Sequence, residues 1–220
     1  MLVIGHRANN VIKLRNYIVH GVDAVELDLT SSGVGHGPDS IKPATLKEAI
    51  LRRVLTEPTS SAESMIREIV ENHIHVIIDI KTPVGYEPFF NAFLGKGQGV
   101  MVSSKFHPVI RSLKEKGFRI PMLASIQERP VSPSSVMEAA LADGLSVELS
   151  YVDEDLVNEV HEANGLVFVW TVNDVDQALH LQTLGVDAII TDRPDLIVPA
   201  VKGGVEDRSL ARELYRWLTS

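Results

Sequence analysis

The feature that most constrains the fold is a regular alternation of short apolar runs and longer amphipathic stretches along all 220 residues. The short runs are rich in Val, Ile and Leu, as buried strands are, and the longer stretches have the spacing of one-sided helices. Strands are expected at residues 2–5, 24–30, 75–81, 99–104, 120–125, 146–150, 167–172 and 188–191. Eight strands, each followed by a helical stretch, predict a closed (β/α)8 barrel, or TIM barrel.

The main competing architecture for alternating strands and helices is an open doubly wound sheet, and the sequence favours the barrel. That sheet usually has a glycine-rich turn after its first strand, whereas GHRANN carries only Gly5. No linker or shift in composition marks a boundary, so residues 1–220 are expected to form a single domain.

Helices are expected at residues 9–19, 45–54, 62–72, 88–93, 108–116, 133–142, 154–164, 174–184 and within 194–218. Left-handed helix caps are expected at Gly21, Gly117, Gly144, Gly165 and Gly185.

Charge and composition narrow the classes of function. The formal charge of -8 argues against a broad nucleic-acid surface, and the absence of cysteine excludes disulfides and thiolate chemistry. The opening MLVIGHR has no signal-peptide pattern, and no apolar run approaches the roughly 20 residues of a membrane-spanning helix. We expect a cytoplasmic protein with no nucleic-acid partner and no membrane span. The apolar face of SLARELYRWL is compatible with a contact between copies of the chain in a homo-oligomer.

Acidic residues lie on the expected second and third strands, where alternation gives them a common face. In AVELDLT, Glu26 and Asp28 share one face, and in VIIDIK, Asp79 and Lys81 do the same. Carboxylates among apolar residues are costly to bury without a partner, and a divalent cation such as Mg2+ or Ca2+ is one natural partner. A salt-bridge network with Lys81 and Arg7 is the other. The spacing alone does not decide between them.

Two histidines add weight to an active site. His6 directly follows the first expected strand, where residues of a barrel face the catalytic pocket. His36 lies in the Gly-rich segment GVGHGP after the acidic strand, where the backbone can approach a ligand closely. Two imidazoles beside an acidic cluster supply a base and an acid near neutral pH.

The order of the motifs HR, ELD, H, DxK, WTVN and TDxP resembles that of the glycerophosphodiester phosphodiesterases, a family of metal-dependent TIM barrels. The resemblance covers nearly the whole chain, from VIGHR through VELDLT, IIDIKT, SSKFHP and VFVWTVN to GVDAIITDRPD. It implies that His6 and His36 are the acid/base pair. It also implies that Glu26, Asp28 and Asp79 hold a divalent cation, Mg2+ or Ca2+.

The same resemblance implies that Arg7 and Lys81 contact phosphate and that Trp170 lines the pocket. Glu148, near the end of the expected sixth strand, is a further candidate for substrate binding, with a surface or ion-paired position as the alternative. Asp192, shortly before a proline, is expected to cap the segment that follows it.

The implied reaction is hydrolysis of a small-molecule glycerophosphodiester to an alcohol and sn-glycerol 3-phosphate. The alternatives are a lysophospholipase D-like or cyclising phosphodiesterase acting on lysophospholipids, and a catalytically weakened barrel that serves as a binding protein. Product analysis would distinguish them.

Several departures from the family pattern bear on the site. Asp79 stands where the family more often has Glu, and His36 is followed by Gly where the family has Asp. The family's Pro-Glu-Asn-Thr element is replaced by HRANN, in which Asn9 or Asn10 takes the place of its Asn. The family's insertion after the second histidine is missing, and Lys105 separates a Ser-Phe pair in SSKFHP. A more open pocket is the expected result.

Overall fold

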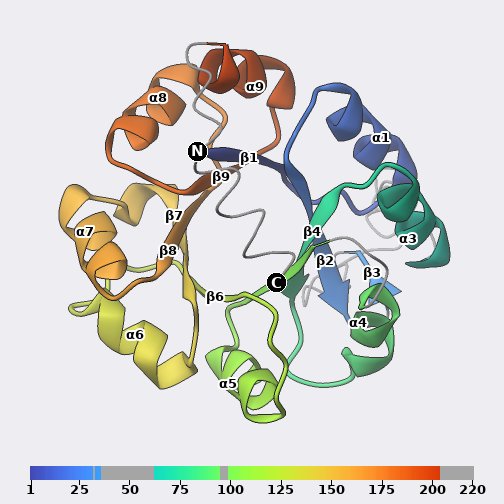
Figure 1. Cartoon of the computed structure of the whole chain (residues 1–220), viewed down its shortest axis with the longest axis horizontal. Helices are drawn as coiled ribbons and strands as arrows, with labels where there is room; N and C mark the ends of the chain where they lie inside the picture. Colours follow the sequence, from blue (N-terminus) through green and yellow to red (C-terminus); the bar gives the residue numbers. More distant parts are fainter. Residues whose placement is uncertain (32, 36–61, 95–98, 204–220) are drawn as a thin grey trace, which may run out of the picture.

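The computed structural model describes residues 1–31, 33–35, 62–94 and 99–203. Their eight parallel strands close into a barrel, because β1 pairs with both β2 and β9 (Figure 1). The predicted TIM barrel is confirmed. The strands are β1 (Leu2–Gly5), β2 (Ala24–Thr30), β4 (His75–Ile80), β5 (Val100–Ser104), β6 (Met122–Ile126), β7 (Gly144–Glu148), β8 (Leu166–Trp170) and β9 (Ala188–Thr191).

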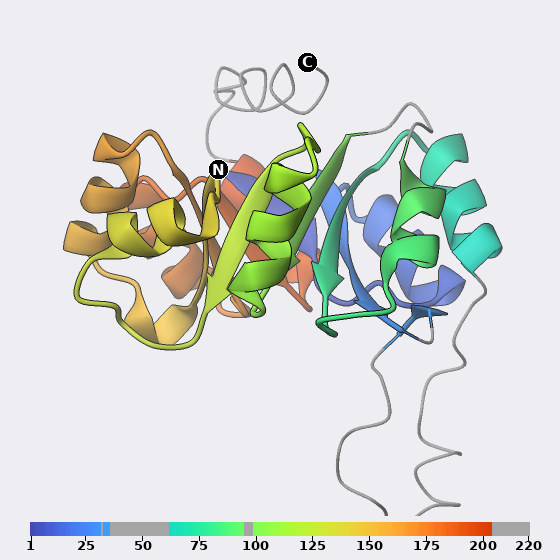
Figure 2. The same ribbon diagram turned by 90° about the horizontal axis from the view of Figure 1, so that it is seen from below.

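Helices surround the barrel and bury their apolar faces against the outer side of the strands (Figures 1 and 2). They are α1 (Val11–Val19), α3 (Ala62–Glu71), α4 (Glu87–Phe93), α5 (His107–Glu115), α6 (Pro133–Ala140), α7 (Glu154–Glu162), α8 (Val175–Thr183) and α9 (Pro194–Lys202). The helix expected at 45–54, and the part of the last helical region from residue 204 onward, lie outside the described residues. None of the helices described here is long and apolar enough to cross a membrane.

The interior of the barrel changes from apolar to polar along the strands. Its apolar part is one buried cluster that includes Ala24, Ile77, Met101 and Leu123. Two positions further along the same strands, on the same face, the residues are polar: Glu26, Asp79, Ser103 and Ser125. The strands are parallel, so these polar residues meet at the carboxyl end of the barrel.

Two of the five expected glycine caps are wrong. Gly144 begins β7, and a Cβ there would lie 2.3 Å from the carbonyl oxygen of Leu166, while Leu141 takes the left-handed conformation that ends α6 (φ 55°). At the end of α7, Asn164 rather than Gly165 has positive φ (58°). Both glycines therefore serve close packing, whereas Gly21, Gly117 and Gly185 have the expected positive φ.

A short strand that the sequence pattern did not predict follows β2. This strand, β3 (Gly33–Val34), pairs antiparallel with the end of β2, with Leu29 opposite Val34. The amide of Gly35 donates to the carbonyl oxygen of Asp28 (3.0 Å) and continues the turn. β3 thus fixes the backbone on one side of the acidic strand.

Candidate active site

A pocket opens at the carboxyl end of the barrel and collects most of the predicted site. It encloses about 370 Å³ of empty space, part of it open to solvent. It is lined by His6, Arg7, Glu26, Asp79, Lys81, Ser103, Lys105, Ser125, Ser146, Trp170 and Ile190. All eight strands, or the turns after them, contribute residues, so the pocket exists only in the closed barrel.

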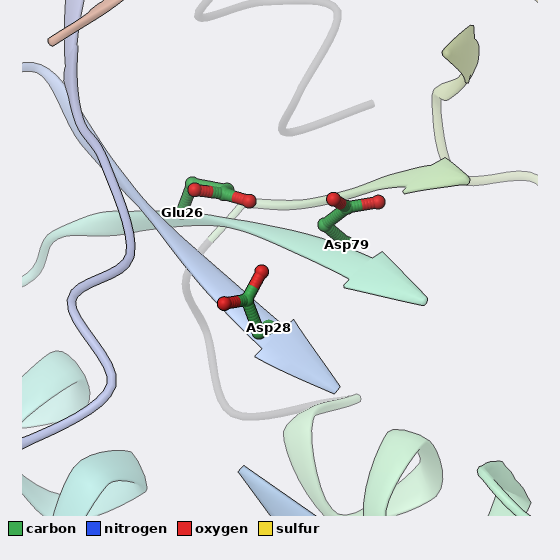
Figure 3. Close-up of side chains that lie close together, drawn as sticks. All are labelled: Glu26, Asp28 and Asp79. Carbon is green, nitrogen blue, oxygen red and sulfur yellow. The ribbon is translucent and has the colours of Figure 1, made fainter. Parts of the chain in front are cut away.

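Three carboxylates converge beside the pocket from neighbouring strands. Glu26 and Asp28 on β2 and Asp79 on β4 each offer an oxygen within 4.8 Å of the other two (Figure 3). Asp28 pairs in register with Asp79, which brings the two strands' carboxylates to the same level. The three residues are 4%, 0% and 7% exposed, so water compensates little of their charge.

These residues fit a hard divalent cation. The donor set is all oxygen, as Mg2+ and Ca2+ require. The Oδ1 atom of Asp79 is buried and has no hydrogen-bond partner among the residues that the structure describes. Burial, reinforced by the charges of Asp28 and Asp79, raises the pKa of Glu26 to about 8. A cation would keep all three carboxylates ionised and supply the partner that Asp79 lacks.

Lys81 lies among the same carboxylates. Its ammonium contacts Asp79 directly, lies 2.8 Å from Asp28 Oδ1 and 3.8 Å from Glu26 Oε1. Burial opposes its charge, but the carboxylates, Asp79 foremost, outweigh this and raise the pKa of Lys81. The salt-bridge network considered from the sequence is therefore present, and it occupies the same residues as the candidate metal site.

Arg7 is held in place through its backbone. It has positive φ (50°), a conformation that costs a non-glycine residue about 1 kcal/mol. Its amide donates to Glu26 Oε2 (2.8 Å), which offsets this cost, and its Nε lies 3.6 Å from Asp28 Oδ2. The guanidinium is 43% exposed, so it can reach a ligand in the pocket mouth.

Asn9 reaches the site, and Asn10 does not. The Asn9 amide donates to Asp28 Oδ2 (2.9 Å), and its carbonyl accepts from the Asp28 backbone (2.8 Å). Asn10 caps α1 by accepting from the amide of Lys13 (2.8 Å). The structure therefore distinguishes the two asparagines that the sequence left as alternatives.

His6 is oriented from both sides of its ring. Nδ1 lies 3.1 Å from Asp192 Oδ1, and Nε2 lies 3.8 Å from Glu26 Oε2. The hydrogen bond from His6, against the opposing effect of burial and with help from Lys13, lowers the pKa of Asp192 to about 2. Because an ionised carboxylate can only accept, Nδ1 carries the proton and Nε2 is left to face the pocket.

The expectation that Asp192 caps the following helix is wrong. Arg193 is the N-cap residue of α9, and no side chain caps that helix. Asp192 precedes the cap, and its carboxylate contacts His6 and Lys13 at the pocket mouth. Its backbone amide donates to Asn173 in the WTVN motif (2.8 Å), which fixes this turn.

The remaining predicted residues fall into three cases. Trp170 lines the pocket, as expected of it. Glu148 does not: its carboxylate accepts from the amide of Ser150 (3.0 Å) and caps the short 3-10 helix Leu149–Tyr151. His36 lies outside the described residues.

Tyr17 is a supporting residue that the sequence pattern did not single out. Its hydroxyl donates to the carbonyl oxygen of His6 (2.8 Å), and its ring occupies the space beside Gly5, where a Cβ would lie 2.3 Å from the ring. The signal in the sequence was Gly5 directly before His6. Any larger residue there would displace Tyr17 and with it the backbone of His6.

Known proteins match both the sequence and the fold. An Oleispira antarctica phosphodiesterase, solved in complex with the product sn-glycerol-3-phosphate, superposes with a TM-score of 0.75 at 20% identity, covering 92% of this chain and 97% of that one. A Bacillus subtilis protein provisionally named a glycerophosphodiester phosphodiesterase is 35% identical over 60 residues, 27% of this chain and 24% of the relative. A glycerophosphodiester phosphodiesterase of Arabidopsis thaliana is 42% identical over 45 residues, 20% of this chain and 14% of the relative.

The sequence matches to these two relatives thus span about a quarter or less of their length. The family match is much longer, since residues 45–196 match the Glycerophosphoryl diester phosphodiesterase family. This segment includes Asp79, Lys81, Trp170 and Asp192, whereas His6 and Arg7 lie in the turn after β1, and Glu26 and Asp28 lie on β2. The chain belongs to the glycerophosphoryl diester phosphodiesterase family.

Proposed function

We propose that this protein hydrolyses glycerophosphodiesters to an alcohol and sn-glycerol 3-phosphate, with a divalent cation and histidine acid/base catalysis. The observation that carries the proposal is the convergence of His6 with Glu26, Asp28 and Asp79 in one pocket. Family membership supports the reaction type. The product bound to the Oleispira antarctica enzyme is the one that this proposal predicts.

The carboxylates Glu26, Asp28 and Asp79 would hold Mg2+ or Ca2+, and the bound ion would polarise a phosphoryl oxygen and offset negative charge in the transition state. Arg7, exposed at the mouth, is placed to bind a second phosphoryl oxygen with its fork of donors. Lys81 would balance the carboxylates and present its ammonium to the phosphate.

His6 would transfer a proton at Nε2, and the contact of Nδ1 with Asp192, which leaves Nε2 facing the pocket, supports this role. In the hydrolysis, a water molecule gives up a proton as its oxygen attacks phosphorus, the bond from phosphorus to the leaving oxygen breaks, and that oxygen takes up a proton. One of these two proton transfers is assigned to His6. We assign the other to His36 from the family pattern, and its position lies outside the described residues.

The polar floor of the pocket suits the glycerol part of the substrate. Ser103, Ser125 and Ser146 come from consecutive strands, line the pocket and are 3–6% exposed. None of the hydrogen bonds among the described residues uses their hydroxyl groups as donor or acceptor. Three such hydroxyls provide donors and acceptors for a polyol.

The test is a product assay on glycerophosphoglycerol and glycerophosphocholine, with and without a chelator. We expect sn-glycerol 3-phosphate and the free alcohol, loss of turnover on chelation and recovery with Mg2+ or Ca2+. A cyclic phosphate, or turnover confined to lysophospholipids, would favour the alternative reactions. Binding of the diesters without turnover under any metal would indicate a binding protein instead.

A further inference from the structure

Lys105 stands at the mouth of the pocket in a position that interrupts the family's Ser-Phe pair. It directly follows β5, yet its ammonium lies 4.9 Å from the ring centroid of Trp170 at the end of β8. β6 and β7 lie between these two strands in the barrel. The side chain of Lys105 therefore reaches across part of the mouth.

The three cations of the pocket differ in how far their charge is already paired. Lys81 contacts three carboxylates, and Arg7 faces Asp28. Within the part of the chain that the structure describes, no carboxylate forms a salt bridge with Lys105, and its ammonium lies against the ring of Trp170. Burial foremost, and then the charge of Lys81, lower the pKa of Lys105, and the charge of Asp79 only partly opposes them.

Trp170 is the aromatic surface that a ligand entering this mouth would meet. The face of an indole attracts quaternary and primary ammonium groups, and such faces are how proteins recognise choline. Here an ammonium of the protein itself covers that face. A substrate with a cationic alcohol would have to displace Lys105 and then remain close to its charge.

We propose that Lys105 selects substrates by the charge of the departing alcohol, favouring an alcohol that bears a phosphate or carboxylate over one that bears an ammonium. The inference rests on the proposed phosphodiesterase function, since it concerns the group that leaves the bound phosphodiester. The three donors of the ammonium are free to contact such an anion, and the flexible stem lets them follow it.

The experiment compares three diesters that differ in the alcohol: glycerophosphocholine (cationic), glycerophosphoglycerol (uncharged) and glycerophosphoinositol 4-phosphate (anionic). We expect the wild type to show the highest kcat/KM on the anionic diester. In Lys105→Gln, the ratio of kcat/KM for the anionic over the cationic diester should fall roughly tenfold. Lys105→Arg should retain the wild-type ratio.

Lys116→Gln is the matched control, because it removes the same charge at the far end of α5, away from the pocket. It should leave the ratio unchanged. An unchanged ratio in Lys105→Gln, with all three diesters still hydrolysed, would overturn the role of Lys105 and leave the proposed function intact.

A binding measurement separates the two claims further. Calorimetric titration of the same diesters in the presence of chelator reports charge selection without turnover. If the wild type hydrolyses none of the three, the proposed function fails, and the affinity ratio in Lys105→Gln still decides the inference. A ratio that does not move in either measurement rejects it.

Discussion

The two ends of the barrel use acidic residues in opposite ways. At the carboxyl end, Glu26, Asp28 and Asp79 crowd together within 4.8 Å. At the amino end, three aspartates lie just before β2, β7 and β9, no two of which are adjacent in the barrel, and each is compensated separately. Each accepts a hydrogen bond from a backbone N–H of a neighbouring strand and contacts one basic side chain. The amides are those of Val3 for Asp23, Met122 for Asp143 and Val167 for Asp187. The basic partners, in the same order, are Lys202, Lys114 and His161.

We interpret this difference as one between residues that stabilise the fold and residues proposed to act on substrate. An aspartate that accepts a strand amide and faces one basic group satisfies a backbone donor locally. Three carboxylates in one small space repel one another, and this repulsion adds to burial, the larger cause, in raising the pKa of Glu26. Acidic residues at the two ends are therefore expected to have different roles, as for the two faces of a TIM barrel.

The largest expected effect comes from replacing His6 at the carboxyl end, compared with replacing His161 at the amino end. His6→Ala should lower kcat by about 10²- to 10⁴-fold, because proton transfer at Nε2 is lost. Steady-state kinetics and thermal unfolding on the same preparation provide the measurement. His161→Ala, which removes the partner of Asp187, should keep kcat within a factor of two to three (about 0.5 kcal/mol). Comparable losses of kcat in both variants would break the comparison.

Glu26→Gln should change how stability depends on pH. In the metal-free protein, the folded state keeps the Glu26 proton up to about pH 8, whereas the unfolded chain releases it above the usual value of 4.5. The wild-type free energy of unfolding should therefore fall as pH rises from about 5 to 8, by on the order of a few kcal/mol. Glu26→Gln should remove this part of the slope.

Urea unfolding in chelator at several pH values measures that slope for both proteins. Other groups titrate in the same range, so the quantity of interest is the difference between wild type and variant. Glu115→Gln, at an exposed ion pair on α5, serves as the control and should follow the wild type. Parallel curves of unfolding free energy against pH for wild type and Glu26→Gln would show that crowding of the carboxylates does not lower the stability of the fold.

Asp192→Asn should reduce kcat by roughly 10- to 100-fold with little change in KM or in metal affinity, because it acts through the orientation and tautomer of His6. Lys13→Gln removes the contact of Asp192 with Lys13 and leaves its bond to His6, so kcat should change little. If Asp192→Asn instead raised KM alone, Asp192 would be a substrate contact.

The smallest expected effect is at the amino end. Asp187→Asn should lower the free energy of unfolding by about 1 kcal/mol, since the bonds to Val167 and His161 are weakened. Its kcat/KM should stay that of the wild type. The same change at the other end, Asp28→Asn, should abolish metal-dependent turnover. A stable but inactive Asp187→Asn would contradict the division of roles.

Much of this structure could be predicted from the sequence. The apolar runs located all eight strands, and alternation along β2 and β4 placed the three carboxylates on one face, because strand periodicity is a local property. Bounds were less accurate: the strand expected at 146–150 begins at Gly144, where close packing against Leu166 rather than a cap requires glycine.

The residues that were missed depend on contacts between distant segments. Asp192, Tyr17 and Lys105 have ordinary explanations within their own segments, as a cap, a core aromatic and a surface lysine. Each acquires its role only when the barrel brings it to a partner from another strand. Glu148 shows the converse, since its place at a strand end was right but its carboxylate turns to its own loop.

The bond between His6 and Asp192 joins positions 186 residues apart, across the seam where β1 meets β9. During synthesis, β1 leaves the ribosome long before its second neighbour exists, so its β9 edge stays unpaired until nearly the whole barrel has been made. Asp192 can therefore orient the His6 imidazole only once β9 has joined the barrel. Hydrolytic activity in this protein would therefore indicate that β1 and β9 have paired, and partly folded chains would be inactive.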